Sequence, residues 1–313
     1  MKTLKFFRII LAAVPLFFFG ACSSIDIQQT LYLGNVDVKA PINTPPLHLS
    51  YREKKGGEVT VSPKLIFNQN RSIDAVTDKS FYSTLTAQDS LRLRNLFKEK
   101  NLNWAYPSVL IGLDLDFATS SSFSFYGGIH FADESNRSMV GGNIGLGIGG
   151  KKGNAAFRFD IGAGFQKSFF DAQTVVKTVS TVNGNSTQSI AVYLDSDNSL
   201  NINPFVSVQF NTAYDFPVNF HFQAAYFSQN LLGYTPSRVD IDNPFFNPGS
   251  TITKIDQRTD FTIAMWMIGP GLSYRALDNA SVHLTVKLLR TTSSEIKSNE
   301  WFVLPSFQFD WEF

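Results

Sequence analysis

The sequence is short of several residue types, and each shortage narrows the class of protein. It has one cysteine and four histidines among 313 residues, so we expect no internal disulfide, no metal site and no cofactor. Basic and acidic residues nearly balance, at 27 Lys and Arg against 26 Asp and Glu. That balance gives no basic patch that would favour a nucleic-acid partner. Past residue 19, no apolar run reaches the roughly 20 residues that a membrane-spanning helix needs.

The N-terminal residues form a pattern of their own. Lys2, Lys5 and Arg8 precede an apolar run over residues 9–19, and small residues follow it. The run is too short for a permanent membrane helix, and Pro15 interrupts it. This arrangement is typical of an export signal. Its removal takes away three of the 27 basic residues, which leaves 24 against the 26 acidic ones.

The only cysteine directly follows this signal. Residues 19–24 read Phe-Gly-Ala-Cys-Ser-Ser, which resembles a bacterial lipobox, although Phe19 replaces the usual aliphatic residue. The resemblance implies cleavage before Cys22 and acylation of its thiol and new amino group, so residues 1–21 would be a lipoprotein signal peptide. Outer-membrane lipid would then be a partner of Cys22, and two or more acyl chains anchor a protein stably. An ordinary secretory signal with an unrelated cysteine is the alternative.

Phenylalanine is abundant, with 30 residues, and it recurs in alternating segments of about ten residues, which is typical of transmembrane β-barrels. The alternation is clearest at the C-terminus, where Phe307, Phe309, Trp311 and Phe313 share one phase. Successive side chains of a strand point to opposite faces, so one face of this strand is apolar. The pattern resembles the C-terminal signal that barrel-assembly machinery reads, which makes that machinery an expected partner.

Nine earlier segments repeat the pattern, so the sequence predicts an all-β fold, an antiparallel transmembrane barrel of about ten strands over residues 58–313. The segments are 59–67, 109–117, 123–131, 144–148, 157–165, 206–214, 220–226, 261–274 and 282–288. The eighth begins with Phe261, Ile263 and Met265 in the lipid-facing phase and then changes phase. A bulge or kink near Gly269 would explain that change.

The connections predict the orientation of the barrel. Alternate connections are short and should be periplasmic turns, whereas most of the others are long and should be extracellular. The short ones are 118–122, 150–154, 215–218 and 276–280, and the long ones include 69–105, 167–200 and 231–259. An even number of strands places both termini in the periplasm, so the lipid on Cys22 would sit in the periplasmic leaflet.

Two segments outside the strands are harder to interpret. Residues 22–57 could form a lipidated periplasmic strap, an extra hairpin or a partial plug, and we favour the strap. Within the first long loop, residues 86–99 have the spacing of one short amphipathic helix.

The interior phase of the predicted strands carries a set of charged residues. They are Lys64, Asp114, Asp116, Arg158, Asp160, Lys287, Asp310 and Glu312. Barrels of about eight strands are just filled by side chains, so we expect paired charges in a closed interior rather than a solute path or a proton relay. Glycines in the same phase, such as Gly128 and Gly147, leave space that residues 23–57 or an inward-folded loop could fill.

A catalytic arrangement is poorly supported. His130 with Asp133, Glu134 and Ser135 is the best Ser–His–acid candidate, but His130 should point inward while its neighbours face lipid. Residues 48–50, His-Leu-Ser, resemble the His-x-Ser of a lipid A deacylase family, yet they precede the barrel. We therefore expect no enzyme.

The sequence favours a surface-binding or accessory subunit of an outer-membrane assembly, with another outer-membrane protein as partner. Tyr234, Phe245 and Phe246 would be exposed loop anchors. The alternatives are a narrow channel and a lipid-modifying enzyme.

Overall fold

The computed structural model describes most of the chain. The described residues are 25–49, 54–68, 72–75, 102–134, 137–182, 184–212, 217–233, 251–256, 260–292 and 301–313. Several predicted features lie outside them, namely the signal peptide over 1–21, Cys22, the helix over 86–99, and Tyr234, Phe245 and Phe246. Within the described part, no helix is long and apolar enough to cross a membrane.

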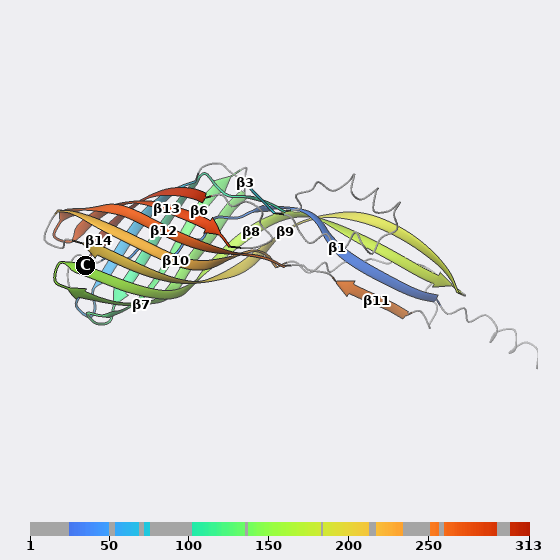
Figure 1. The fold of residues 1–313 in the computed structure, drawn as a ribbon, viewed down its shortest axis with the longest axis horizontal. Helices are drawn as coiled ribbons and strands as arrows, with labels where there is room; N and C mark the ends of the chain where they lie inside the picture. The colour runs from blue at the N-terminus through green and yellow to red at the C-terminus, as the bar shows by residue number, and fades with distance from the viewer. Residues whose placement is uncertain are drawn as a thin grey trace, which may run out of the picture. The chain divides into compact units, whose positions relative to one another are not determined.

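Ten antiparallel strands close into a barrel, as the sequence predicted (Figure 1). They are β2 (Val59–Phe67), β5 (Val109–Ala118), β6 (Phe123–Glu134), β7 (Arg137–Lys152), β8 (Ala155–Val182), β9 (Asn185–Thr212), β10 (Val218–Gly233), β12 (Asp260–Leu277), β13 (Ala280–Thr291) and β14 (Trp301–Glu312). The first strand, β2, pairs with the last, β14, and β8 pairs with β9, so no barrel strand is left with an open edge.

Alternation explains why these segments form a barrel rather than a soluble sheet. Along β5, Ile111 is 59% exposed and Leu115 47%, whereas Asp114 and Asp116 are fully buried. A soluble sheet would bury the apolar phase, but here that phase faces outward and the polar phase faces the lumen. The outward apolar band suits the hydrocarbon of a bilayer, in which every backbone polar group must be paired within the protein.

The predicted phase change in the eighth strand is wrong. Ile263 and Met265 are buried in the interior, whereas Trp266 and Leu272 face outward at 55% and 54% exposure. One phase therefore continues through Gly269, and the register with β10 shifts only at its far end, between Asn230 and Leu232. The sequence misled because this part of the interior is apolar, so hydrophobicity does not distinguish the two faces there.

The barrel has two different ends. The short-turn end carries the connections 119–122, 153–154, 213–217 and 278–279. The opposite end is called the long-connection end. One predicted long loop is instead regular strand, because β8 and β9 run on for 28 residues each and meet at residues 183–184. Residues 174–182 are rich in Val and Thr, whose branched side chains favour strands.

The N-terminal segment passes through the barrel from one end to the other. It starts as β1 (Ile25–Lys39), whose residues 36–39 pair in parallel with β4 (Leu102–Ala105). That strand belongs to the long connection between β2 and β5 and also pairs with β3 (Ser72–Ala75). Residues 40–49 are then buried without exception. The chain emerges at the short-turn end, where the Gly57 amide donates to the Ala118 carbonyl at 2.7 Å.

The chain divides into two compact units, and the barrel belongs to one of them with residues 35–172, 195–234 and 259–313. The second unit consists of residues 1–34, 173–194 and 235–258. Within it, β1 pairs in parallel with β11 (Thr251–Asp256). Gln29 is buried and donates to the Thr178 hydroxyl of β8 at 3.4 Å, so the outer parts of β1, β8 and β11 form a small sheet.

The barrel interior changes character along its length. Towards the long-connection end the inward side chains are apolar and almost fully buried, and they pack with the entering N-terminal segment. They include Leu110, Met139, Phe170, Phe227, Leu231, Met265, Leu289 and Leu304 from the wall, and Val38, Ile42 and Trp104 from the segment and its partner strand. Towards the short-turn end the inward residues are polar or charged.

Candidate functional site

Residues 40–49, called the lumen segment below, are fixed to the wall by side-chain hydrogen bonds. The segment contains Pro41, Pro45 and Pro46, and proline offers a carbonyl acceptor but no amide donor. Side chains of the barrel wall donate hydrogen bonds to these carbonyl groups. Gln229 donates to the Pro41 carbonyl at 3.1 Å, and Gln223 donates to the Pro46 carbonyl at 2.8 Å.

Further polar side chains complete this contact. Gln308 donates to the Leu47 carbonyl at 2.8 Å, Lys287 donates to the Thr44 hydroxyl at 2.9 Å, and the His48 amide donates to Gln209 at 2.8 Å. Each of these buried groups therefore has a partner, as a stable interior requires. Sequence reasoning missed the glutamines because uncharged amides in the lumen phase look no different from solvated side chains.

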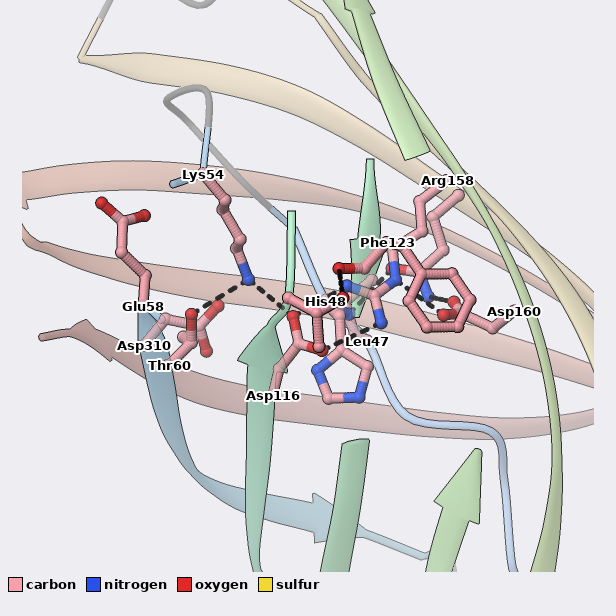
Figure 2. Close-up of polar contacts among 12 residues, drawn as sticks. Leu47, His48, Lys54, Glu58, Thr60, Asp116, Phe123, Arg158, Asp160 and Asp310 are labelled. Atoms are coloured by element: carbon pink, nitrogen blue, oxygen red, sulfur yellow. Dashed lines mark hydrogen bonds and ion pairs between the residues drawn. The ribbon is translucent and has the colours of Figure 1, made fainter. Parts of the chain in front are cut away.

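Arg158 is the centre of the charge cluster at the short-turn end (Figure 2). Its guanidinium forms a two-pronged contact with Asp116, at 2.8 and 3.1 Å, and its Nε lies 2.6 Å from Asp160. Lys54 Nζ lies 2.6 Å from Asp116 and also donates to the Thr60 hydroxyl at 3.0 Å. Lys54 follows the lumen segment, so the cluster joins it to the wall.

The other predicted lumen charges are distributed around the wall. Lys64 pairs with Asp114 at 2.6 Å, and Asp310 lies 3.0 Å from His283 Nε2. Lys287 donates to Thr44 of the lumen segment. Glu312 lies at the short-turn end and is 9% exposed. The charged residues predicted from the sequence are therefore inside the barrel, but they form several clusters rather than one.

The lumen glycines make room for these side chains. A Cβ on Gly147 would collide with the Arg158 guanidinium, and one on Gly128 would collide with the Asp114 carboxylate. The space that these glycines leave is thus occupied by neighbouring polar side chains, which is a reason for small residues at those positions.

The structure describes only part of the catalytic set that the sequence suggested. His130 is buried and points inward, Asp133 is exposed, and Ser135 lies outside the described residues. A different Ser–His–Asp set occurs deeper in the wall, where Ser273 Oγ lies 2.8 Å from His283 Nδ1 and His283 contacts Asp310. Its members are at most 2% exposed, so a substrate could not reach Ser273 without rearrangement. Spacing along the sequence gave no signal for it, because it joins three strands.

A pocket of about 500 Å³ lies at the short-turn end. The turns 119–122 and 153–154 contribute to its rim, and Arg158, Lys54 and His48 contribute to its lining. The ring of His48 packs on Tyr126, with centroids 4.7 Å apart. Both His48 ring nitrogens and both amide atoms of Asn211 are buried there without a hydrogen-bond partner.

Comparisons with known proteins agree with the fold. No family model and no curated protein matches the sequence. Among solved structures, the outer membrane protease OmpT from Escherichia coli is similar over 82% of this chain and 97% of its own, with 9% identity and a TM-score of 0.39. LpxR from Salmonella typhimurium is similar over 80% of this chain and 99% of its own, with 7% identity and a TM-score of 0.30.

The translocator domain of the autotransporter NalP from Neisseria meningitidis is a third such structure, at 5% identity over 84% of this chain and 90% of its own, with a TM-score of 0.31. These likenesses concern the fold alone. The strand pairing of the chain itself shows that it is a closed, ten-stranded antiparallel β-barrel.

One expectation needs correction at this point. The sequence led us to expect that the protein is not an enzyme, but its structural neighbours include an outer membrane protease. That expectation is wrong, because one fold can carry both catalytic and binding proteins and a barrel therefore does not exclude an enzyme.

Proposed function

We propose that the protein is a surface-binding barrel that serves as an accessory subunit of an outer-membrane assembly, with its lumen closed by its own N-terminal segment. The single observation that supports this proposal most is the path of the lumen segment. Ten consecutive buried residues occupy the lumen, and wall glutamines bind their carbonyl groups. A barrel filled in this way acts as an anchor, so the surface that binds the partner protein lies outside the lumen.

The narrow-channel alternative is less well supported by the same contacts. A solute would have to displace both the lumen segment and the apolar side chains around it, among them Trp104 and Met265, which are fully buried. The polar pocket reaches the charge cluster from the short-turn end, but the apolar core lies beyond.

The second unit supplies a surface for a partner. Val192, Tyr193 and Leu194 follow one another on β9 and are 43%, 44% and 78% exposed. Successive residues point to opposite faces of a strand, so both faces of this hairpin expose apolar groups. Exposed apolar patches on a folded protein often mark interaction sites. The partner in this proposal is another outer-membrane protein.

Copurification from native membranes tests this part of the proposal. We expect a stoichiometric partner to copurify with the unmodified chain. We expect Leu194→Ser to reduce the amount of copurified partner strongly. Leu277→Ser is the matched control, because Leu277 is 61% exposed but lies next to a turn at the short-turn end. The proposal fails if no stoichiometric partner is found, or if both variants reduce it equally.

The path of the chain also bears on the position of the lipid anchor. Residues 36–39 pair with β4 in a long connection, and in barrels of this kind long connections are extracellular. The lumen segment prevents the preceding chain from returning through the barrel. The proposal therefore places Cys22 and its lipid on the extracellular side, instead of the periplasmic leaflet that a strap would require.

Thiol labelling in intact cells distinguishes these two positions. Because acylation would block Cys22, the only native cysteine, a new cysteine would be the only reactive thiol. We expect Asp26→Cys to react with an impermeant maleimide in intact cells, and Asp278→Cys to react only after the outer membrane is permeabilised. The opposite pattern would contradict the proposed orientation. Separately, fatty-acid labelling that persists in Cys22→Ala would exclude lipidation of Cys22.

A further inference from the structure

The pocket at the short-turn end has the size and lining of a ligand site. Its volume of about 500 Å³ lies within the range of small-molecule pockets. The serines at positions 120, 121 and 122 are part of its lining, so hydroxyl groups surround its rim. Arg158, His48 and Asn211 come from three different segments of the chain and line it as well.

Four polar atoms in this pocket have no partner. His48 is 4% exposed and Asn211 is 1% exposed, yet neither ring nitrogen of His48 and neither amide atom of Asn211 makes a hydrogen bond. Leaving such groups buried and unpaired is costly, so native structures pair them with protein, water or a ligand. Other buried side chains of the wall, such as Gln223 and Asn219, also have unpaired atoms, so the four atoms of His48 and Asn211 are distinguished by their place in the lining of a pocket.

The lining offers more hydrogen-bond donors than the protein uses. Lys54 can donate three hydrogen bonds and gives two, to Asp116 and Thr60. Arg158 can donate five, and three go to Asp116 and Asp160. Lys151 adds a third cation at the rim.

The nearby acids do not offset this excess of donors on the pocket surface. Asp116 and Asp160 are fully buried behind the cations, and their oxygens accept bonds from Arg158, Lys54, Ser207 and Gln209. Among the described residues that line the pocket there is no aspartate or glutamate. An acceptor-rich anion therefore fits the lining better than a cation does.

We propose that this pocket binds a phosphorylated polyol, with Arg158, Lys54 and Lys151 around the phosphate and with His48, Asn211 and the serines around the hydroxyls. The planar fork of an arginine suits phosphate oxygens, and a lysine adds a point charge. The volume exceeds that of a bare phosphate ion, which is why the proposal includes a polyol. The same group occurs in free sugar phosphates and in glycerophospholipid headgroups.

The first measurement is calorimetric titration of the full-length protein in detergent with sn-glycerol 3-phosphate, with glycerol as the uncharged comparison. We expect saturable binding of the phosphate ester and none of glycerol. If the ester shows no saturable binding at millimolar concentration, and the lipid experiment below is also negative, the proposal is overturned.

Two variants locate the site. Lys151→Glu should weaken binding by about tenfold or more, because it reverses a charge within reach of the ligand. Lys152→Glu is the matched control, since it makes the same charge change at the next residue, which does not line the pocket. Asn211→Leu should also weaken binding, by removing a pair of buried polar atoms from the lining. Equal loss in the two lysine variants would mean that general charge attraction explains the binding, and the proposal would fail.

A third experiment distinguishes the two sources of the ligand. The protein is placed in nanodiscs of phosphatidylcholine with or without phosphatidylglycerol, and its thermal unfolding is followed. Stabilisation by phosphatidylglycerol that Lys151→Glu abolishes and Lys152→Glu retains indicates a lipid headgroup. Calorimetric binding without that effect indicates a free sugar phosphate or glycerophosphate.

Discussion

The two ends of the barrel interior differ in chemistry although the same ten strands build both. At the long-connection end, side chains such as Phe227 and Met265 form a dry apolar core with the entering chain. At the short-turn end, Arg158 and its carboxylate partners lie beside a pocket. A single barrel can therefore contain a core like that of a soluble protein at one end and a polar site at the other.

Arg158→Ala should cause the largest loss of stability. It leaves Asp160 without its cation and Asp116 with Lys54 alone, and breaking a buried ion pair costs about 3–5 kcal/mol. We expect a loss of about 3 kcal/mol, the lower end of that range, because water from the adjacent pocket can solvate the carboxylates that lose their partner. Urea unfolding of the barrel in detergent measures the change, with Lys152→Ala, an exposed lysine on the preceding strand, as control. A loss below about 1 kcal/mol would show that the cluster does not hold the short-turn end together.

Met265→Ala tests the apolar end and the corrected phase of β12. Met265 is fully buried, so its truncation should leave a cavity and cost about 2–3 kcal/mol in the same unfolding experiment. Ile268→Ala is the comparison on the outward face of the same strand. Lipid chains can fill the space that it leaves, so the cavity part of the cost should be absent there. A larger loss for Ile268→Ala would reverse the assignment of the faces.

Phe309→Asp should impair assembly of the whole barrel, because it changes the lipid-facing phase of a strand that both ends share. A charged residue facing lipid costs up to ~2–4 kcal/mol for basic residues and less for acidic ones. We expect less heat-modifiable barrel in outer membranes, and the same for deletion of Phe313. Phe309→Leu, which keeps an apolar side chain at the same position, provides the control. Normal amounts of folded Phe309→Asp would remove support for the C-terminal assembly signal at Phe307, Phe309, Trp311 and Phe313.

Asn211→Leu should have the smallest effect on stability. The two amide atoms of Asn211 are buried without partners, so their removal in the ligand-free protein should change the free energy of unfolding by no more than about 1 kcal/mol, in the stabilising direction. Asn143→Leu is the contrasting variant, because the Asn143 amide donates to Asp114 at 3.2 Å. We expect that variant to be destabilised. Equal losses of unfolding free energy in the Asn211→Leu and Asn143→Leu variants would mean that Asn211 has hydrogen-bond partners in solution.

The sequence predicted the barrel well because alternation reports directly on which face meets lipid. Strands such as β5 and β14 have apolar residues in one phase and polar residues in the other, so their positions could be located by reading the sequence. The method failed at Ile263 and Met265, where the interior is apolar too. It also failed for residues 167–200, because strands that continue beyond the membrane lose the apolar phase on which the prediction depends.

The contents of the lumen could be predicted only in part. The charged phase identified Arg158 and Asp116 as inward residues, but their pairing depends on strand register, which the sequence did not define. The lumen segment was harder still. Its prolines and its few charges fit an external strap as well as an internal plug, and the four glutamines that bind it come from three different strands, β9, β10 and β14.

Ion conductance in planar bilayers tests the central claim, that the N-terminal segment closes the lumen, most directly. Purified full-length protein should show no steady conductance. A variant in which residues 41–47 are replaced by a Gly-Ser sequence of equal length should still form a barrel and should open channels. It lacks the prolines and also Asn43, whose side-chain amide donates to the Gly142 carbonyl of the wall at 3.1 Å. Stable channels in the unmodified protein, with the same conductance in the variant, would contradict the claim.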